Sequence, residues 1–193
     1  MRRTALPRPT IEQIQAELKR LKSRNQYVHL LSTTIFSLMS AAAAAVLICV
    51  LLMPILRIYG SSMEPTLHDG EIVISLKNAQ PDPGDLIGFY YNNKILVKRV
   101  IAVSGDWVNI DPAGNVSVND IPLDEPYVME KALGECDISL PYQVPEGRIF
   151  VMGDHRLTSV DSRSTSVGCT AEEQIVGQIV FCIWPPRDFG FVK

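Results

Sequence analysis

Residues 85–103, with the sequence DLIGFYYNNKILVKRVIAV, contain two apolar, β-branched runs on either side of an Asn-Asn pair. Two such runs joined by two turn-forming residues are typical of an antiparallel β-hairpin. Similar short runs, separated by turn residues, occur on both sides of this hairpin. They predict further strands within residues 71–76, 106–110, 115–118, 148–152 and 175–184. This regular spacing favours a mainly β domain at residues 57–193, an antiparallel β-barrel or sandwich.

The second run of the hairpin contains a lysine that is unusual for a buried strand. Because side chains alternate between the two faces of a strand, Leu96, Lys98, Val100 and Ala102 are expected on one face. Burying an ammonium ion costs more free energy than burying a neutral amine, so the usual result is a lowered pKa. A fall from about 10.4 to about 8 corresponds to about 3 kcal/mol and makes a neutral amine available as a general base. The alternative is a lysine on an edge strand whose charged end stays in water.

A charge-free block precedes the predicted β domain. Residues 25–56 contain no Asp, Glu, Lys or Arg, and the most apolar stretch, residues 30–53, would form a helix of about 36 Å. About 20 apolar residues suffice to cross a bilayer core of roughly 30 Å. We therefore predict a transmembrane helix at residues 29–56, with Pro54 near its end. A buried helix of a soluble protein and a cleavable signal peptide are the alternatives, although the apolar part of a signal peptide is only about 7–15 residues long.

The charges on the two sides of this block differ. Residues 1–24 carry seven basic and two acidic side chains, whereas the whole chain has a net charge of −3. The positive-inside rule therefore predicts a cytoplasmic arm at residues 1–28 and a β domain outside the membrane. Apolar residues recur at helical spacing in this arm, at Ile11, Ile14, Leu18 and Leu21. They indicate an amphipathic helix on the inner leaflet, with a solvated tail as the alternative.

The composition limits the possible classes of protein. With 47% hydrophobic and 20% charged residues, the chain is not intrinsically disordered. Its net negative charge does not fit a nucleic-acid coat, so we expect no nucleic-acid partner.

Two polar segments outside the predicted strands carry groups suited to chemistry. Residues 60–67, GSSMEPTL, start four residues after the charge-free block, and the Gly-Ser-Ser run allows a tight turn with an exposed hydroxyl. Residues 153–163, GDHRLTSVDSR, follow a predicted strand, and Asp161 and Arg163 can form an ion pair there. Taken singly, each segment is equally compatible with a solvated polar loop.

Together with the lysine, these segments give the chain a specific resemblance. From the anchor to about Trp184 it resembles the bacterial type I signal peptidases of the Ser/Lys class. The resemblance rests on four blocks in order, which are residues 60–67, Gly84-Asp85, Lys98-Arg99 followed by Gly105-Asp106, and residues 153–163. It implies that Ser62 is the nucleophile and Lys98 the general base, without a metal or another cofactor.

The resemblance also assigns roles to the last block. It implies that Ser159 hydrogen-bonds the lysine and that Asp161 and Arg163 form a structural ion pair in a loop that starts at Gly153-Asp154. The backbone N–H of Ser62 is expected to stabilise the oxyanion. Some relatives place a second donor, a hydroxyl, two positions before the nucleophile. This chain has Gly60 at that position, so the sequence leaves the second donor open.

The activity implied by the resemblance is that of a membrane-bound serine endopeptidase. Such an enzyme removes signal peptides from translocated preproteins after a small-x-small site. The implied location is the bacterial cell membrane, with the lipid bilayer around the anchor and the Sec or Tat export machinery as an indirect partner. The residues that flank the two catalytic positions are candidates for binding the substrate strand by β-addition. They are Ile58, Tyr59, Leu96 and Val97.

Some alternatives stay open at this point. Cys136 and Cys169 lie in the predicted outer domain, where a disulfide is permitted, but the sequence does not decide whether they pair. A self-cleaving repressor-type peptidase also uses Ser-Met and a distant lysine, but it needs a soluble DNA-binding domain where this chain has a predicted membrane span. A catalytically inactive, membrane-anchored β module is the other alternative. The presence of every implied site residue argues against it.

Overall fold

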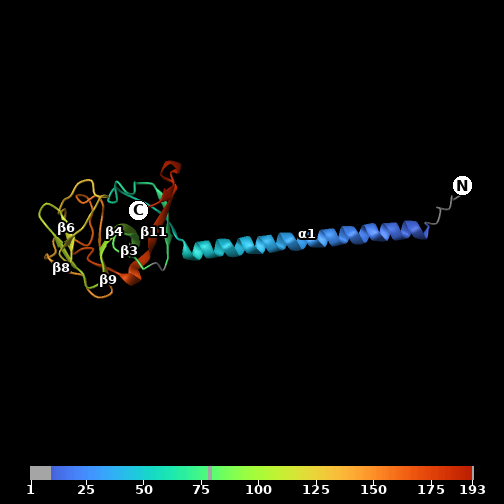
Figure 1. Cartoon of the computed structure of the whole chain (residues 1–193), viewed down its shortest axis with the longest axis horizontal. Coiled ribbons are helices and arrows are strands. Elements are labelled where there is room, and N and C mark those ends of the chain that lie inside the picture. The colour runs from blue at the N-terminus through green and yellow to red at the C-terminus, as the bar shows by residue number, and fades with distance from the viewer. Residues whose placement is uncertain (1–9, 78–79, 193) are drawn as a thin grey trace. The chain divides into compact units, whose positions relative to one another are not determined.

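The computed structural model describes residues 10–77 and 80–192, so that Arg2, Arg3 and Arg8 of the predicted arm lie outside the described residues. The chain divides into two compact units, Met1–Ile48 and Cys49–Lys193. A single helix, α1 (Ile11–Leu52), forms the described part of the first unit and runs into the second (Figure 1). It contains no buried residue and is long and apolar enough to cross a membrane. Residues 11–28 of the predicted arm are therefore helical and continuous with the predicted span.

The second unit contains two antiparallel sheets, which confirms the mainly β prediction (Figure 1). The strands of the larger sheet are β1 (Ile55–Arg57), β2 (Ile72–Leu76), β3 (Leu86–Tyr91), β4 (Lys94–Ala102), β9 (Arg148–Met152), β10 (Thr170–Ala171), β11 (Ile175–Trp184) and β12 (Gly190–Phe191). The strands of the smaller sheet are β5 (Trp107–Ile110), β6 (Val116–Val118), β7 (Ile121–Pro122) and β8 (Tyr142–Gln143). The larger sheet has the order β1-β2-β11-β3-β4-β9-β10, with β12 beside β11, and the smaller has the order β7-β6-β5-β8. Two short 3₁₀ helices are η1 (Glu172–Gln174) and η2 (Pro186–Asp188).

The strands expected from hydrophobic runs are all present. The predicted hairpin is β3 and β4, and its register runs from Leu86 opposite Arg99 to Tyr91 opposite Lys94. The sequence did not predict β1, β7, β8, β10 and β12. Each of these strands has only two or three residues, too few for an alternating pattern to be detected.

The predicted end of the transmembrane helix at residue 56 is wrong. The helix ends at Leu52, and residues 55–57 form β1, which pairs with β2. Pro54 has no N–H with which to continue the helical hydrogen bonds. The carbonyl of Pro54 accepts a hydrogen bond from the backbone N–H of Ser75, at 2.9 Å. The chain therefore passes from the helix into the sheet at this proline.

The hydrophobic core of the second unit consists of clusters of buried side chains. One cluster joins Phe150 and Met152 of the larger sheet to Val108 and Val116 of the smaller sheet. A second cluster packs residues that follow β1 against β2 and β11. The four cysteines are described as free thiols, so the pairing of Cys136 with Cys169 is not present in the described residues.

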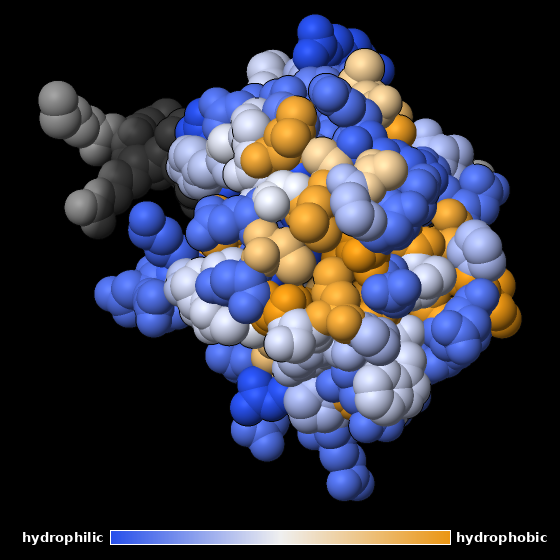
Figure 2. All heavy atoms as spheres, turned by 90° about the vertical axis from the view of Figure 1, so that its left-hand side faces the viewer, coloured by the Kyte–Doolittle hydropathy of each residue, from blue (hydrophilic) through white to orange (hydrophobic). Residues whose placement is uncertain are grey.

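The surface of the second unit is not uniformly polar. The side that carries β6 and β8 in Figure 1 shows apolar side chains gathered near its centre, with polar side chains around them (Figure 2). Exposed apolar side chains of the smaller sheet include Trp107 and Ile121, which are 48% and 70% exposed.

We predict that Phe150→Ala lowers the free energy of unfolding by about 3–5 kcal/mol, because it removes a fully buried ring from the cluster that joins the sheets. For a domain of this size the midpoint of thermal unfolding should fall by about 10 °C or more. Thermal unfolding of the full chain in detergent, followed by near-UV circular dichroism, measures this change. The control is Ile121→Ala, at an exposed position of β7. Equal midpoints for the two variants would show that the cluster does not hold the sheets together.

Candidate active site

Ser62 lies in a loop whose two ends are joined by backbone hydrogen bonds. The backbone N–H of Ile58 donates to the Glu71 carbonyl at 2.8 Å, and the Gly70 N–H donates to the Ile58 carbonyl at 3.0 Å. Met63, next to Ser62, is 2% exposed and packs in the core. The loop is therefore held both at its ends and beside the serine.

Gly60 provides the turn that leads to the serine. Its φ of +85° lies in the left-handed region, which strongly favours glycine. Its backbone N–H donates to Asp69 Oδ1 at 2.7 Å, which ties the turn to the far side of the same loop. Ser62 follows two residues later and is half-buried.

Lys98 reaches this serine from β4. Its Nζ lies 2.8 Å from Ser62 Oγ in a hydrogen bond, and the whole residue is only 3% exposed. Its partner across the hairpin is Ile87, which is fully buried. The structure thus brings together the two side chains that the sequence placed 36 residues apart.

The surroundings of Lys98 favour its neutral form. Burial, the largest effect, lowers the pKa of the amine from 10.5 to about 8, while the nearby Asp161 carboxylate opposes this change and Arg163 adds to it. A neutral amine has a free electron pair, and Ser62 Oγ is within hydrogen-bond reach of it. This arrangement allows the amine to remove the hydroxyl proton of the serine.

Asp161 lies at the centre of a buried polar cluster. Arg163 donates to both of its carboxylate oxygens at 2.9 Å, so the ion pair expected between these residues is present. The backbone N–H of Gly153 also donates to Asp161 Oδ2 at 2.9 Å. Burial alone would raise the pKa of Asp161, but the hydrogen bonds and charge of Arg163 hold it below its usual value. The carboxylate therefore stays ionised close to Lys98.

Ser159 has a different partner from the one expected. Its hydroxyl donates to Asp161 Oδ2 at 2.6 Å, and no hydrogen bond joins it to Lys98 among the described residues. A hydroxyl has one proton to donate, and an ionised carboxylate is a stronger acceptor than a neutral amine, so Ser159 donates to Asp161. The prediction of a direct bond between Ser159 and the lysine is therefore corrected to an indirect link through Asp161.

Sequence reasoning missed the role of Arg99, the neighbour of Lys98. Its guanidinium pairs with Asp154 through two hydrogen bonds, at 2.9 Å and 2.7 Å, and also donates to Thr66 Oγ1 at 3.2 Å. It lies 3.9 Å from the ring centre of Tyr127. Arg99 thus joins β4 to the serine loop and to the loop that follows β9. The sequence did contain a signal for this role, because Arg99 is a second charged residue, next to Lys98, within an otherwise apolar strand.

A second arginine supports the same loop. Arg156 forms a buried ion pair with Glu125, and its Nε donates to the Gly153 carbonyl at 3.1 Å. Gly153 must be a glycine, because a Cβ at that position would overlap the Ser159 side chain and the Ser62 carbonyl. The Ser62 carbonyl also accepts the His155 N–H at 3.1 Å. The two loops are thus packed backbone to backbone beside Lys98.

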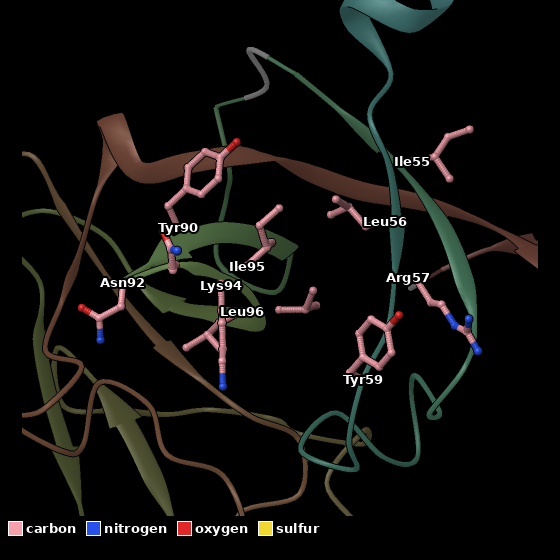
Figure 3. A pocket seen from close by; sticks show the side chains of 11 residues that line it. Ile55, Leu56, Arg57, Tyr59, Tyr90, Asn92, Lys94, Ile95 and Leu96 are labelled. Atoms are coloured by element: carbon pink, nitrogen blue, oxygen red, sulfur yellow. The ribbon is translucent and has the colours of Figure 1, made fainter.

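An open groove leads away from the serine. It has a volume of about 840 Å³ and lies between β1 and the end of the β3–β4 hairpin (Figure 3). A much smaller cavity, of about 70 Å³, adjoins Ser62 and Lys98. Arg57, Tyr59 and residues 95–97 line both spaces, so the two are adjacent.

The candidate substrate-binding residues are all found at these spaces. Tyr59, Leu96 and Val97 line both the groove and the small cavity. Ile58 lines only the small cavity and is otherwise buried in the core, at 4% exposure. The sequence did not predict that Leu56 of β1 would also line the groove.

Comparisons with known proteins identify the family of this chain. The family described as Signal peptidase, peptidase S26, matches residues 31–184 of this chain. Thylakoidal processing peptidase 1, chloroplastic, of Arabidopsis thaliana is 36% identical over 143 residues, which cover 65% of this chain and 40% of that protein. Signal peptidase I of Bacillus amyloliquefaciens is 34% identical over 166 residues, which cover 79% of this chain and 85% of that protein.

Among solved structures, a signal peptidase I from Enterococcus faecalis is 26% identical, with a TM-score of 0.43, and the match covers 52% of this chain and 97% of that one. The chain spans less than half of the plant relative but most of the Bacillus relative. The family match covers the anchor, the serine loop, the lysine strand and the loop of residues 153–163. The chain belongs to the peptidase S26 family of signal peptidases, which are serine endopeptidases.

Proposed function

We propose that this protein removes signal peptides from translocated preproteins after a small-x-small site, with Ser62 as the nucleophile and Lys98 as the general base. The observation that carries this proposal is the 2.8 Å contact between Ser62 Oγ and an amine that is buried and has a pKa of about 8. A buried amine beside a hydroxyl lowers stability without a structural benefit, which argues against an inactive β module. A repressor-type peptidase is not expected to contain a helix that can span a membrane.

The proposed reaction has two stages. Neutral Lys98 takes the Ser62 proton while Oγ forms a bond to the carbonyl carbon of the scissile peptide. The protonated lysine then gives this proton to the leaving amine as the C–N bond breaks, which leaves an acyl-enzyme. In the second stage Lys98 takes a proton from a water molecule whose oxygen attacks the ester carbonyl. The protonated lysine returns this proton to Ser62 Oγ as the ester C–O bond breaks, which releases the carboxylic acid and restores the serine hydroxyl.

The developing oxyanion needs a hydrogen-bond donor. Among the described residues, the backbone N–H of Ser62 has no acceptor and is therefore available for this role. Ser159, Asp161 and Arg163 act indirectly in this mechanism, because they hold a negative charge near the lysine without contacting Ser62.

The substrate is proposed to bind as an extended strand. β1 pairs only with β2, and β4 pairs with β9 only from Arg99 onward, so residues 94–98 have a free backbone edge in the described part of the sheet. An extended peptide can add to such edges, with alternate side chains in the two spaces. The small cavity beside Ser62 has a volume of only about 70 Å³, which suits a small side chain at the cleavage position.

The membrane places the enzyme near its substrate. We propose that α1 spans the lipid bilayer of a bacterial cell membrane with the basic N-terminal arm in the cytoplasm and residues 57–193 outside. The seven basic residues among residues 1–24 support this orientation. Preproteins would arrive from the Sec or Tat export machinery, still tethered to the membrane by their signal peptides.

We predict that Ser62→Ala and Lys98→Ala each lower kcat/KM for cleavage of a preprotein about a thousandfold or more, because each removes one half of the proposed dyad. Cleavage of a labelled precursor with an Ala-x-Ala site by the purified full chain measures this. The matched controls are Ser61→Ala and Lys77→Ala, whose side chains are exposed. Substantial activity in either dyad variant would rule out the proposed mechanism.

The second prediction concerns pH. Because the neutral form of Lys98 is the active base and its pKa is about 8, kcat/KM should rise tenfold per pH unit below pH 8 and level off above it. A series of initial rates at low substrate concentration between pH 6 and about pH 10.5 tests this. A profile that keeps rising to the pKa of a free lysine would show that the amine is not desolvated in the working enzyme.

The third prediction concerns orientation. In spheroplasts of cells that express the chain with a different epitope at each end, added protease should remove the C-terminal epitope and leave the N-terminal one intact. The reason is that only the domain after α1 is proposed to lie outside the membrane. Lysed spheroplasts serve as the control in which both epitopes disappear. Loss of the N-terminal epitope from intact spheroplasts would reverse the proposed orientation and leave the chemistry of the dyad untouched.

A further inference from the structure

The first part of α1, residues 11–28, is an exposed helical arm. None of its residues is buried in the part of the chain that the structure describes. The helix continues without a break to Leu52, and residues 11–52 contain neither glycine nor proline (Figure 1). Sharp kinks in helices occur mainly at such residues, so the arm is expected to continue along the axis of the predicted span. A straight arm of this kind extends about 27 Å beyond the span, away from the membrane surface.

The apolar residues of the arm follow a seven-residue repeat. Their spacing alternates between three and four residues, which places them at positions a and d of a heptad. The residues at positions a and d are Ile11, Ile14, Leu18, Leu21, Asn25 and Val28. Apart from Ala16 and Tyr27, the other positions are polar or charged. The stripe is therefore as narrow as the seam of a coiled coil, whereas a helix that packs on a protein core usually has a third apolar position in each heptad.

The polar residues at the seam indicate the partner. Asn25 occupies an a position, where a single asparagine typically fixes the register and the number of helices at a cost in stability. Glu17 is at position g, and Lys22 is at position e of the following heptad. In a parallel pair of identical helices these positions face each other, so Glu17 of one copy would meet Lys22 of the other. This complementary charge favours a second copy of the same arm.

The surface of the arm has a hollow that suits such a partner. Its volume is about 470 Å³, and it is lined by Leu18, Leu21, Lys22, Asn25, Gln26 and His29. The first four of these residues occupy positions a, d, e and a. Four residues in this arrangement form the hole that accepts a d side chain from the facing helix of a parallel dimer. Leu21 of a second copy would enter this hole, and by symmetry Leu21 of the first copy would enter the matching hole of its partner.

We propose that residues 11–28 of two copies of this chain form a parallel two-stranded coiled coil beside the membrane. Both copies insert into the membrane in the same direction, which makes the arms parallel and raises the effective concentration of each arm near the other. This effect matters because isolated helices shorter than about 12–15 residues are marginally stable in water, and the arm is only slightly longer. The inference goes beyond the proposed function, because the arm contains no residue of the proposed dyad or of the loops around it.

The test is disulfide cross-linking of the full chain in isolated membranes. Cys49→Ala first removes the native cysteine of α1. Leu21→Cys then places a thiol in the seam, and Ser23→Cys is the matched control at position f on the opposite face. Two cysteines form a disulfide only when their Cα atoms are within about 7 Å, so copper phenanthroline should convert Leu21→Cys to a covalent dimer about tenfold or more faster than Ser23→Cys. Electrophoresis without a reducing agent measures the dimer.

A second pair of variants tests whether the seam holds the two helices together. In the Leu21→Cys chain, Leu18→Glu introduces a charge at position a and should slow cross-linking to the rate of Ser23→Cys. Ala16→Glu introduces the same charge at position f and should leave the rate unchanged.

Three results would overturn the proposal. Equal rates for Leu21→Cys and Ser23→Cys would indicate random collisions, which do not depend on the face of the helix. Rapid cross-linking that Leu18→Glu does not slow would place the contact outside the seam. Absence of a covalent dimer in every variant would show that the arm contacts lipid or water instead of a second copy.

Discussion

The contact between the buried amine of Lys98 and the hydroxyl of Ser62 is the interaction on which the rest of the site depends. Lowering the pKa of the lysine from 10.5 to about 8 corresponds to about 3 kcal/mol. Burying the protonated amine destabilises the folded state relative to the unfolded state by this amount. The destabilisation is complete below about pH 8, where the amine is protonated in both states, and disappears as the pH rises toward 10.5. Lys98 therefore lowers the stability of the protein at neutral pH. This loss of stability accompanies the proposed role of Lys98, which needs a neutral amine beside the serine.

Three buried arginine–carboxylate pairs hold the irregular backbone around this contact. Arg99 with Asp154, Arg156 with Glu125, and Arg163 with Asp161 are each almost inaccessible to water. Removing one partner of such a pair leaves an uncompensated buried charge, which typically costs about 3–5 kcal/mol. Because Asp154 also accepts the hydroxyl of Thr66, the same network includes the serine loop. These ion pairs and hydrogen bonds tie together loops that have little regular backbone pairing of their own.

The groove has a different physical origin from the site. It exists because β1 and the end of the β3–β4 hairpin are not paired on one side in the described sheet, which leaves backbone groups for an extended peptide. A separate and much smaller cavity, of about 70 Å³, adjoins Ser62 and Lys98. The proposed function assigns the groove to an extended substrate strand and the small cavity to the side chain at the cleavage position.

The sequence by itself determined the long elements and predicted the two residues of the proposed dyad. The apolar runs of residues 85–103 specify a hairpin through local alternation, and the uncharged residues 25–56 specify an apolar helix, because both patterns repeat over many neighbouring residues. The blocks around Ser62 and Lys98 pointed to the proposed nucleophile and base, and the structure shows the contact between these two side chains. Only the tertiary structure decided that the helix ends at Leu52, that Ser159 donates to Asp161, and that Arg99 holds Asp154. The partners of the Arg99 and Arg156 pairs are separated by 55 and 31 residues along the chain, so no local pattern can specify them. A strand as short as β1 likewise exists only because β2 provides its partner.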